Sequence, residues 1–252
     1  MAASGDGTQC SSALGPRADA LAPVIERLAR DLIAAPEDEA GHIKTLRRGA
    51  PLFADPSRFA EDMLSGTARL IGRYWIEDEA DFVAVTMATH QLSMLLLRLE
   101  EDPASFGFAS GETAIALAQD EVVALMVAPG ERHGFGLSLL AYRLRQAGWR
   151  VHIAEAAREL AQFVEAVRPL VVGISIGLPG SIAEAERVVF DLRKRCGNTP
   201  PYIAFGGPAF LDPDAGCTRV RPDLVATSAD EMLDWLGRIE SSPRDPPMAG
   251  GD

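Results

Sequence analysis

The chain has 252 residues with 47% hydrophobic residues, enough for one large domain or two ordinary ones, and a formal net charge of −12. Binding to a phosphate backbone needs a concentrated basic face, and the runs 44–48 and 193–195 are too short for one, so we expect no direct nucleic-acid binding. Three scattered cysteines exclude a disulfide framework and a cysteine metal site. No signal peptide and no apolar run long enough to cross a bilayer is apparent, so we expect a soluble cytoplasmic protein without a membrane partner.

The first part of the chain is predicted to be helical. Residues 1–18 have the composition of a disordered tail. From 19 to 102 no segment is typical of a strand, and apolar residues recur at helical spacing. Asp55-Pro56-Ser57 marks one helix start, because Pro is favoured in the first turn. We expect three or four helices in a small all-α bundle, with loops near Pro36 and at 49–51.

The second part is predicted to be an α/β domain. Residues 103–112 have linker composition, and 113–117 could be an extra edge strand or a helical turn. Short apolar strands then alternate with helices over 113–240, which predicts a parallel sheet covered on both faces. The five strands match a flavodoxin-like doubly wound domain in the order 2-1-3-4-5, followed by a disordered tail at 241–252. The expected strands are 122–128, 150–154, 170–175, 202–205 and 224–226, and the expected helices are 137–147, 157–167, 182–195 and 231–239.

Candidate site residues follow three of these strands. In open α/β sheets, ligands bind outside the carboxyl ends of the strands. His133 lies in the loop 130–136 after the first strand, Ser175 in the run 173–180 at the third, and Gly206-Gly207 after the fourth. Glycines in one such loop would indicate only a tight turn. Three glycine-rich loops with a histidine among them favour a binding crevice.

These loops resemble the motifs of the cobalamin-binding domain family over residues 121–240. The loop 130–136 is similar to a DxHxxG motif with Glu131 in place of Asp, Ser175 corresponds to the Ser of SxL, and Gly206-Gly207 to the final GG. The resemblance implies a base-off, His-on cobalamin, either hydroxo- or adenosylcobalamin, with His133 as lower axial cobalt ligand. Glu131 would orient the imidazole, Ser175 would hydrogen-bond the displaced base, and Gly206 and Gly207 would leave room for it. The further contacts that it implies are Gly134, Phe135, Gly136, Leu137, Ile176, Gly177 (where the family has Leu) and Thr227.

The helical part carries a second resemblance. The segment 72–86 is similar to the helical cap that covers the upper face of cobalamin in methyltransferase carriers and light-sensing regulators. Nine residues separate Trp75 from Val85 and Thr86, which stand where repressors of the CarH kind have Glu-His. Together with 130–133, this pattern resembles the PpaA/AerR group of antirepressors. The resemblance implies a regulatory protein rather than an enzyme, responsive to light or redox change, with a DNA-binding repressor of the PpsR/CrtJ type as its partner.

Several alternatives stay open. Trp75 could be an ordinary core residue, and Thr227 with Ser228 could form a helix N-cap. His90 is expected to be a hydrogen-bonded core histidine, the alternative being an approach to the upper axial position, while His42 is expected on the surface and His152 away from the crevice. The competing functions are a corrinoid carrier for methyl transfer and a haem-binding sensor that uses His133 as the ligand.

Overall fold

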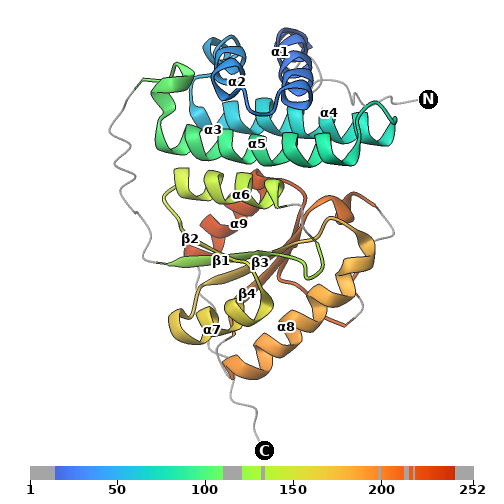
Figure 1. The fold of residues 1–252 in the computed structure, drawn as a ribbon. Coiled ribbons are helices and arrows are strands. Elements are labelled where there is room, and N and C mark those ends of the chain that lie inside the picture. Colours follow the sequence, from blue (N-terminus) through green and yellow to red (C-terminus); the bar gives the residue numbers. More distant parts are fainter. Residues whose placement is uncertain are drawn as a thin grey trace, which may run out of the picture. The chain divides into compact units, whose positions relative to one another are not determined.

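The computed structural model describes residues 15–109, 121–131, 134–197, 200–212, 216–217 and 219–241. The chain divides into two compact units, residues 1–112 and 113–252. The first is helical and the second is an α/β unit, as the sequence predicts (Figure 1).

The helical unit is built from α1 (Gly15–Ala34), α2 (Glu39–Leu46), α3 (Pro56–Phe59), α4 (Ser65–Ile76) and α5 (Phe82–Glu101), with the short turns η1 (Ala50–Leu52), η2 (Ala60–Leu64) and η3 (Pro103–Phe106). Aspartates begin two of these helices, the first at the start predicted at 55–57. Asp55 accepts a hydrogen bond from the backbone N–H of Arg58 at 2.9 Å, and Asp81 accepts one from Ala84 at 2.8 Å. The core lies where α1, α4 and α5 pack together, and its fully buried members include Leu28, Leu32, Met63, Leu92 and Leu95.

Two predicted boundaries of this unit are wrong. Helix α1 already begins at Gly15, so the expected tail over 1–18 is too long, and residues 1–14 lie outside the described part of the chain. The expected linker over 103–112 starts too early, because Phe106 is fully buried and packs edge-on against Phe59, with ring centroids 6.3 Å apart. Residues 103–106 therefore belong to the helical unit.

Helix α5 also differs from the expectation that no apolar run could cross a bilayer. Its 20 residues are long and apolar enough to do so by length and composition alone. A single helix of this kind is weak support for a membrane span, since core helices pass the same test. Helix α5 packs against α1 and α4 through one buried stripe, which consists of Ala88, Leu92, Leu95, Leu96 and Leu99.

The α/β unit has the predicted fold. Its sheet is parallel throughout, in the order β2-β1-β3-β4-β5, which confirms the expected order. The strands are β1 (Val122–Val127), β2 (Arg150–Ala154), β3 (Val171–Ser175), β4 (Tyr202–Gly206) and β5 (Leu224–Ala226). The helices are α6 (Phe135–Gln146), α7 (Ala157–Val167), α8 (Ile182–Cys196) and α9 (Ala229–Ser241), with the turns η4 (Pro179–Ser181) and η5 (Pro208–Leu211). The segment 113–117, whose conformation the sequence leaves open, lies outside the described residues.

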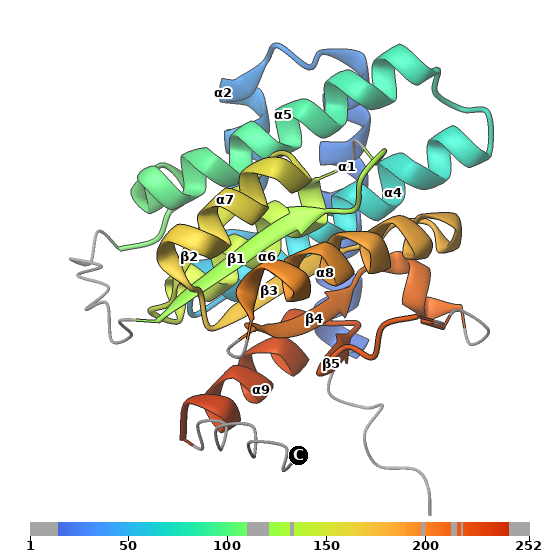
Figure 2. The same cartoon turned by 90° about the horizontal axis from the view of Figure 1, so that it is seen from below.

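Helices cover both faces of this sheet, as apolar strands require. Helices α6 and α9 lie over one face, and α7 and α8 over the other (Figures 1 and 2). Each face has its own core. Leu125 and Trp235 belong to the core under α6 and α9, whereas Met126 and Val189 belong to the core under α7 and α8. Alternate residues of β1 thus serve opposite cores.

Candidate functional site

The carboxyl ends of four strands are in register along one edge of the sheet. Ser175 at the end of β3 pairs with Val127 of β1 and with Gly206 of β4, and Gly206 pairs in turn with Ala226 of β5. The pairing continues one residue further, because the Ile176 N–H donates to the Gly206 carbonyl at 2.8 Å. The loops that carry the cobalamin-family motifs therefore start from adjacent points of this edge. We call it the carboxyl edge.

Glu131 ties two of these loops together. Its carboxylate oxygens accept hydrogen bonds from the backbone N–H groups of Gly177, at 2.7 Å, and Leu178, at 3.1 Å. A Cβ atom on Gly177 would lie 2.8 Å from the Glu131 Oε2 atom, so the close approach depends on a glycine at this position. We did not predict this contact from the sequence. Two features of the sequence indicate it: Glu131 is one methylene longer than the Asp of the motif, and Gly177 stands where the family has Leu.

The expected role of Glu131 toward His133 stays a prediction. Arg132 and His133 lie outside the described residues, so the structure does not place the imidazole. Both Glu131 oxygens already accept amide hydrogen bonds from the loop after β3. The Glu131 carboxylate therefore has a structural role, and orienting His133 would be a second role.

Two glycines of the loop after β1 face open space. Gly130 has a φ of +88°, and a Cβ atom built on Gly130 or on Gly136 would meet nothing within 4 Å. Ser175 is half-buried at the carboxyl edge, and no hydrogen bond of its hydroxyl to a described residue is found. The space beside these two glycines, a hydroxyl without a partner among the described residues and an imidazole in the sequence fit a corrinoid.

Gly206 and Gly207 have a tighter setting than expected. A Cβ atom on Gly206 would lie 2.6 Å from the Ala226 carbonyl oxygen, and one on Gly207, where φ is +103°, would lie 2.5 Å from the Ile176 carbonyl oxygen. The chain's own backbone therefore already requires both glycines. Room for a displaced base is not needed to explain them.

The remaining candidates of the α/β unit have mainly structural surroundings. Leu137 and Ile176 are 4% and 0% exposed and belong to the two cores, so their side chains position the loops rather than face a ligand. Phe135 is also buried, and Gly134 precedes it as the cap of α6. Thr227 donates its N–H to Glu231 at 2.7 Å, while the Glu231 N–H donates to the Ser228 hydroxyl at 3.2 Å. This arrangement is the N-cap alternative.

The candidates of the helical unit lie at its surface. Trp75 is 53% exposed at the end of α4, so it is not the core residue that the alternative reading suggested. Val85 is half-buried, and the exposed Thr86 donates its hydroxyl to the Phe82 carbonyl at 2.7 Å. Trp75 is part of a larger set of exposed apolar side chains around the α4–α5 turn, which we call the apolar end and which comprises Trp75, Ile76, Phe82, Val83 and Met87.

Two histidine predictions are wrong. His42 was expected at the surface but is 1% exposed, and His90 was expected in the core but is exposed. His90 lies on the face of α5 opposite its buried stripe, and its approach to the upper axial position stays a prediction. His152 lies in the edge strand β2, stacked on Phe163 with centroids 3.8 Å apart and 3.3 Å from a Glu159 oxygen. Within the described ranges, no group of three or more His, Cys, Asp or Glu side chains could hold a metal ion.

Comparison with solved structures identifies the fold. The chain is similar to a monomethylamine corrinoid protein of Methanosarcina barkeri, with a TM-score of 0.61 and 14% identity over 86% of this chain and 99% of that one. A cobalamin-binding protein of Desulfitobacterium hafniense DCB-2 has a TM-score of 0.42, with 17% identity over 85% and 97% of the two chains. The methanol:cobalamin methyltransferase complex MtaBC of Methanosarcina barkeri has 0.39, with 16% identity over 95% and 88%. The chain thus has the fold of a corrinoid protein.

Comparison with sequences gives a nearer relative. No protein-family model matches the chain. One curated protein is 33% identical over 170 residues, which are 66% of this chain and 83% of that protein. The chain belongs to the family of this relative, the uncharacterized 20.5 kDa protein of the bchF-crtJ intergenic region of Rhodobacter capsulatus.

Proposed function

We propose that the chain is a cobalamin-binding sensory regulator that acts as an antirepressor on a DNA-binding repressor of photosynthesis genes. The observation that supports cobalamin binding is the carboxyl edge. There the loop of His133 follows β1, Ser175 ends the paired strand β3, and the unit has the fold of a corrinoid protein. The regulatory part is supported by the relative, whose gene lies beside crtJ.

The residues present fit a corrinoid bound base-off and His-on. His133 would hold the cobalt from below, and Ser175 would donate to or accept from the displaced base. Glu131 would keep the loop after β3 at a fixed distance from the loop of His133, through its two amide hydrogen bonds. When bound, the cofactor supplies visible-light absorption and an exchangeable upper ligand. Glycines at 130 and 136 would keep side-chain bulk out of the loop of His133.

The helical unit would form the responsive part. Its apolar end exposes five large side chains to water, including an indole, and an aromatic and aliphatic surface of this kind suits the cover of a corrinoid face. The apolar end would then contact the bound cofactor, which would supply the response to light or redox change. Such a two-state contact can bias binding of a partner. A net charge of −12 favours a basic partner, such as a repressor of the PpsR/CrtJ type.

The cofactor is tested by reconstitution. The purified chain is mixed with hydroxocobalamin, adenosylcobalamin or haem in the dark, passed over gel filtration, and examined by absorption spectroscopy before and after illumination. We expect a corrinoid to stay bound, and His133→Ala to lose it or to change its spectrum. His152→Gln removes an imidazole from the edge strand β2 and serves as the matched control. An unchanged spectrum in His133→Ala, or retention of haem alone, would contradict the assignment.

The partner is tested by pull-down. A PpsR/CrtJ-type repressor from the host is captured on the immobilised chain with and without cobalamin, in darkness and in light. We expect capture that depends on the cofactor and is lost in His133→Ala. Capture that is equal under all conditions, or absent from all, would leave the chain without an antirepressor role.

A corrinoid carrier for methyl transfer is the second candidate, because the fold is shared with a monomethylamine corrinoid protein. The two functions differ in a direct assay. A carrier loaded with methylcobalamin passes the methyl group to an acceptor such as a thiol when a methyltransferase of the same host is added. A regulator keeps the methyl group under these conditions.

A further inference from the structure

A hollow between α1 and α2 lies within the helical unit and contains none of the residues assigned to cobalamin. Its volume is about 350 Å³, and α1 and α2 are in contact along it. Its polar lining residues are Arg27, Asp31, Asp38, His42, Lys44, Thr45 and Arg48. We call it the α1–α2 hollow.

His42 is the unexplained residue of the α1–α2 hollow. The side chain is 1% exposed, and neither Nδ1 nor Nε2 has a hydrogen-bond partner among the described residues. A buried polar group without a partner typically costs about 1–3 kcal/mol, and such groups in native proteins usually mark a missing ligand, ion or water. An imidazole always carries at least one N–H, so at least one of the missing partners is a group that accepts a hydrogen bond.

The charges around His42 favour an anion. Lys44 and Arg48 are exposed, and neither forms an ion pair with a carboxylate of the described ranges. Both acids of the hollow have partners, because Asp31 pairs with Arg27 at 2.8 Å and Asp38 accepts the Gly41 N–H at 3.0 Å as the cap of α2. Two cations without an ion-pair partner among the described residues thus border the hollow.

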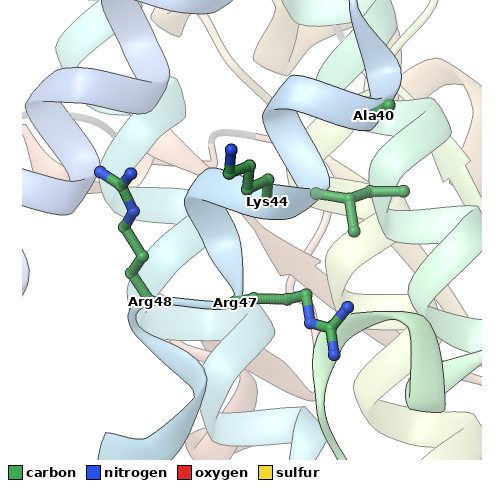
Figure 3. Close-up of a pocket in the computed structure, with 5 residues that line it drawn as sticks. Ala40, Lys44, Arg47 and Arg48 are labelled. Carbon is green, nitrogen blue, oxygen red and sulfur yellow. The ribbon is translucent and has the colours of Figure 1, made fainter.

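A second hollow adjoins the first along the same two cations. It has a volume of about 510 Å³ and is lined by Ala40, Ile43, Lys44, Arg47 and Arg48. Figure 3 shows Lys44 on α2 and, directly after the end of this helix, Arg47 and Arg48, whose side chains point to opposite sides. No acidic residue lines this hollow. In a chain with a net charge of −12, such a cluster is an electrostatic exception.

We propose that the α1–α2 hollow binds a small phosphate-bearing anion, with Lys44 and Arg48 as its charge partners and the His42 N–H, which is enclosed beneath the hollow, as a donor once the ring turns toward the anion. The guanidinium of Arg48 can offer two parallel N–H groups to phosphate oxygens, and the ammonium of Lys44 adds a point charge. His42 gains the acceptor that it lacks. The site would make the helical unit responsive to a second ligand besides a cofactor at the carboxyl edge.

The test uses inorganic phosphate as the probe and the full chain as the receptor. Imidazole resonances are recorded by ¹H–¹⁵N NMR during a phosphate titration at constant ionic strength, with sodium chloride as the reference salt. The chain has four histidines, so single His→Gln variants assign the signals. We expect a saturable shift of the His42 signals, while those of His90 and His152 stay in place.

Charge-removing variants decide the outcome. Lys44→Gln and Arg48→Gln alter exposed side chains, so they should fold normally, as far-UV circular dichroism will show, and each should weaken the apparent phosphate affinity at least tenfold. Arg69→Gln removes an exposed cation from α4 in the same unit and should leave the affinity unchanged. A linear, unsaturable change, the same change with chloride, or a saturable shift that persists in both variants would overturn the proposal.

Discussion

At the residue scale, Glu131 and Gly177 act as a pair. The longer acid reaches across to the loop after β3, and the missing side chain at 177 lets its carboxylate approach the two amides. A departure from the family pattern at one position is thus matched by a departure at the other. The pair fixes the distance between the loop of His133 and the loop of Gly177 without any ligand.

This pairing predicts how the two amides exchange with solvent. Glu131→Ala removes the acceptor, and hydrogen bonds to charged groups contribute about 1.5–3 kcal/mol, so the Gly177 and Leu178 amides should exchange about 10- to 100-fold faster. Gly177→Ala should have a similar effect on Leu178, because its Cβ displaces the carboxylate. Hydrogen–deuterium exchange measures both. Glu231→Ala, which frees the Thr227 amide instead, is the control, and unchanged exchange in Glu131→Ala would refute the pairing.

The burial of His42 and His90 could not be predicted from the sequence. Periodicity places residues on a common helix face but does not say which face packs. Helix α5 is apolar on nearly all sides, so His90 could not be assigned to the core or to the surface by pattern. Helix α2 has only eight residues, too few for its pattern to indicate that His42 is buried.

At the element scale, the sheet could be predicted because its signals are local. All five strands lie within one residue of the expected bounds at either end, since each is a short and mainly apolar run. Right-handed crossovers between parallel strands then leave few possible orders. The turn at 103–106 was missed for the opposite reason. Its Pro and Ser are typical of loops, and only the long-range contact of Phe106 makes it part of a core.

The two faces of α5 predict unequal costs for one substitution. Leu95 is 0% exposed and Leu97 is 45% exposed on the same helix. Leu95→Ala should lower the free energy of unfolding by about 2–5 kcal/mol, because it leaves a cavity, whereas Leu97→Ala should change it by about 0.5 kcal/mol or less. Urea denaturation followed by circular dichroism measures both. Equal losses would mean that the exposed face of α5 is covered in solution.

At the scale of the whole molecule, two units with separate cores are joined in one chain. The sequence predicts this division because helical periodicity gives way to alternating strands and helices. It does not predict the apolar end, since exposure depends on what else packs nearby. The fluorescence of Trp75 reports on the helical unit. The two other tryptophans report on the α/β unit, because Trp149 and Trp235 are 4% and 8% exposed in its core.

This distribution allows a direct test of the cap. The emission of the full chain minus that of Trp75→Phe gives the contribution of Trp75, and replacing an exposed indole by Phe should preserve the fold. If the apolar end covers a bound corrinoid, hydroxocobalamin should quench this contribution strongly, because corrinoids absorb where tryptophan emits. The same additions to His133→Ala correct for light absorbed by free cofactor. Trp75 emission that stays constant while cobalamin binds through His133 would show that the helical unit does not cover the cofactor, and the regulatory contact would then have to lie elsewhere in the chain.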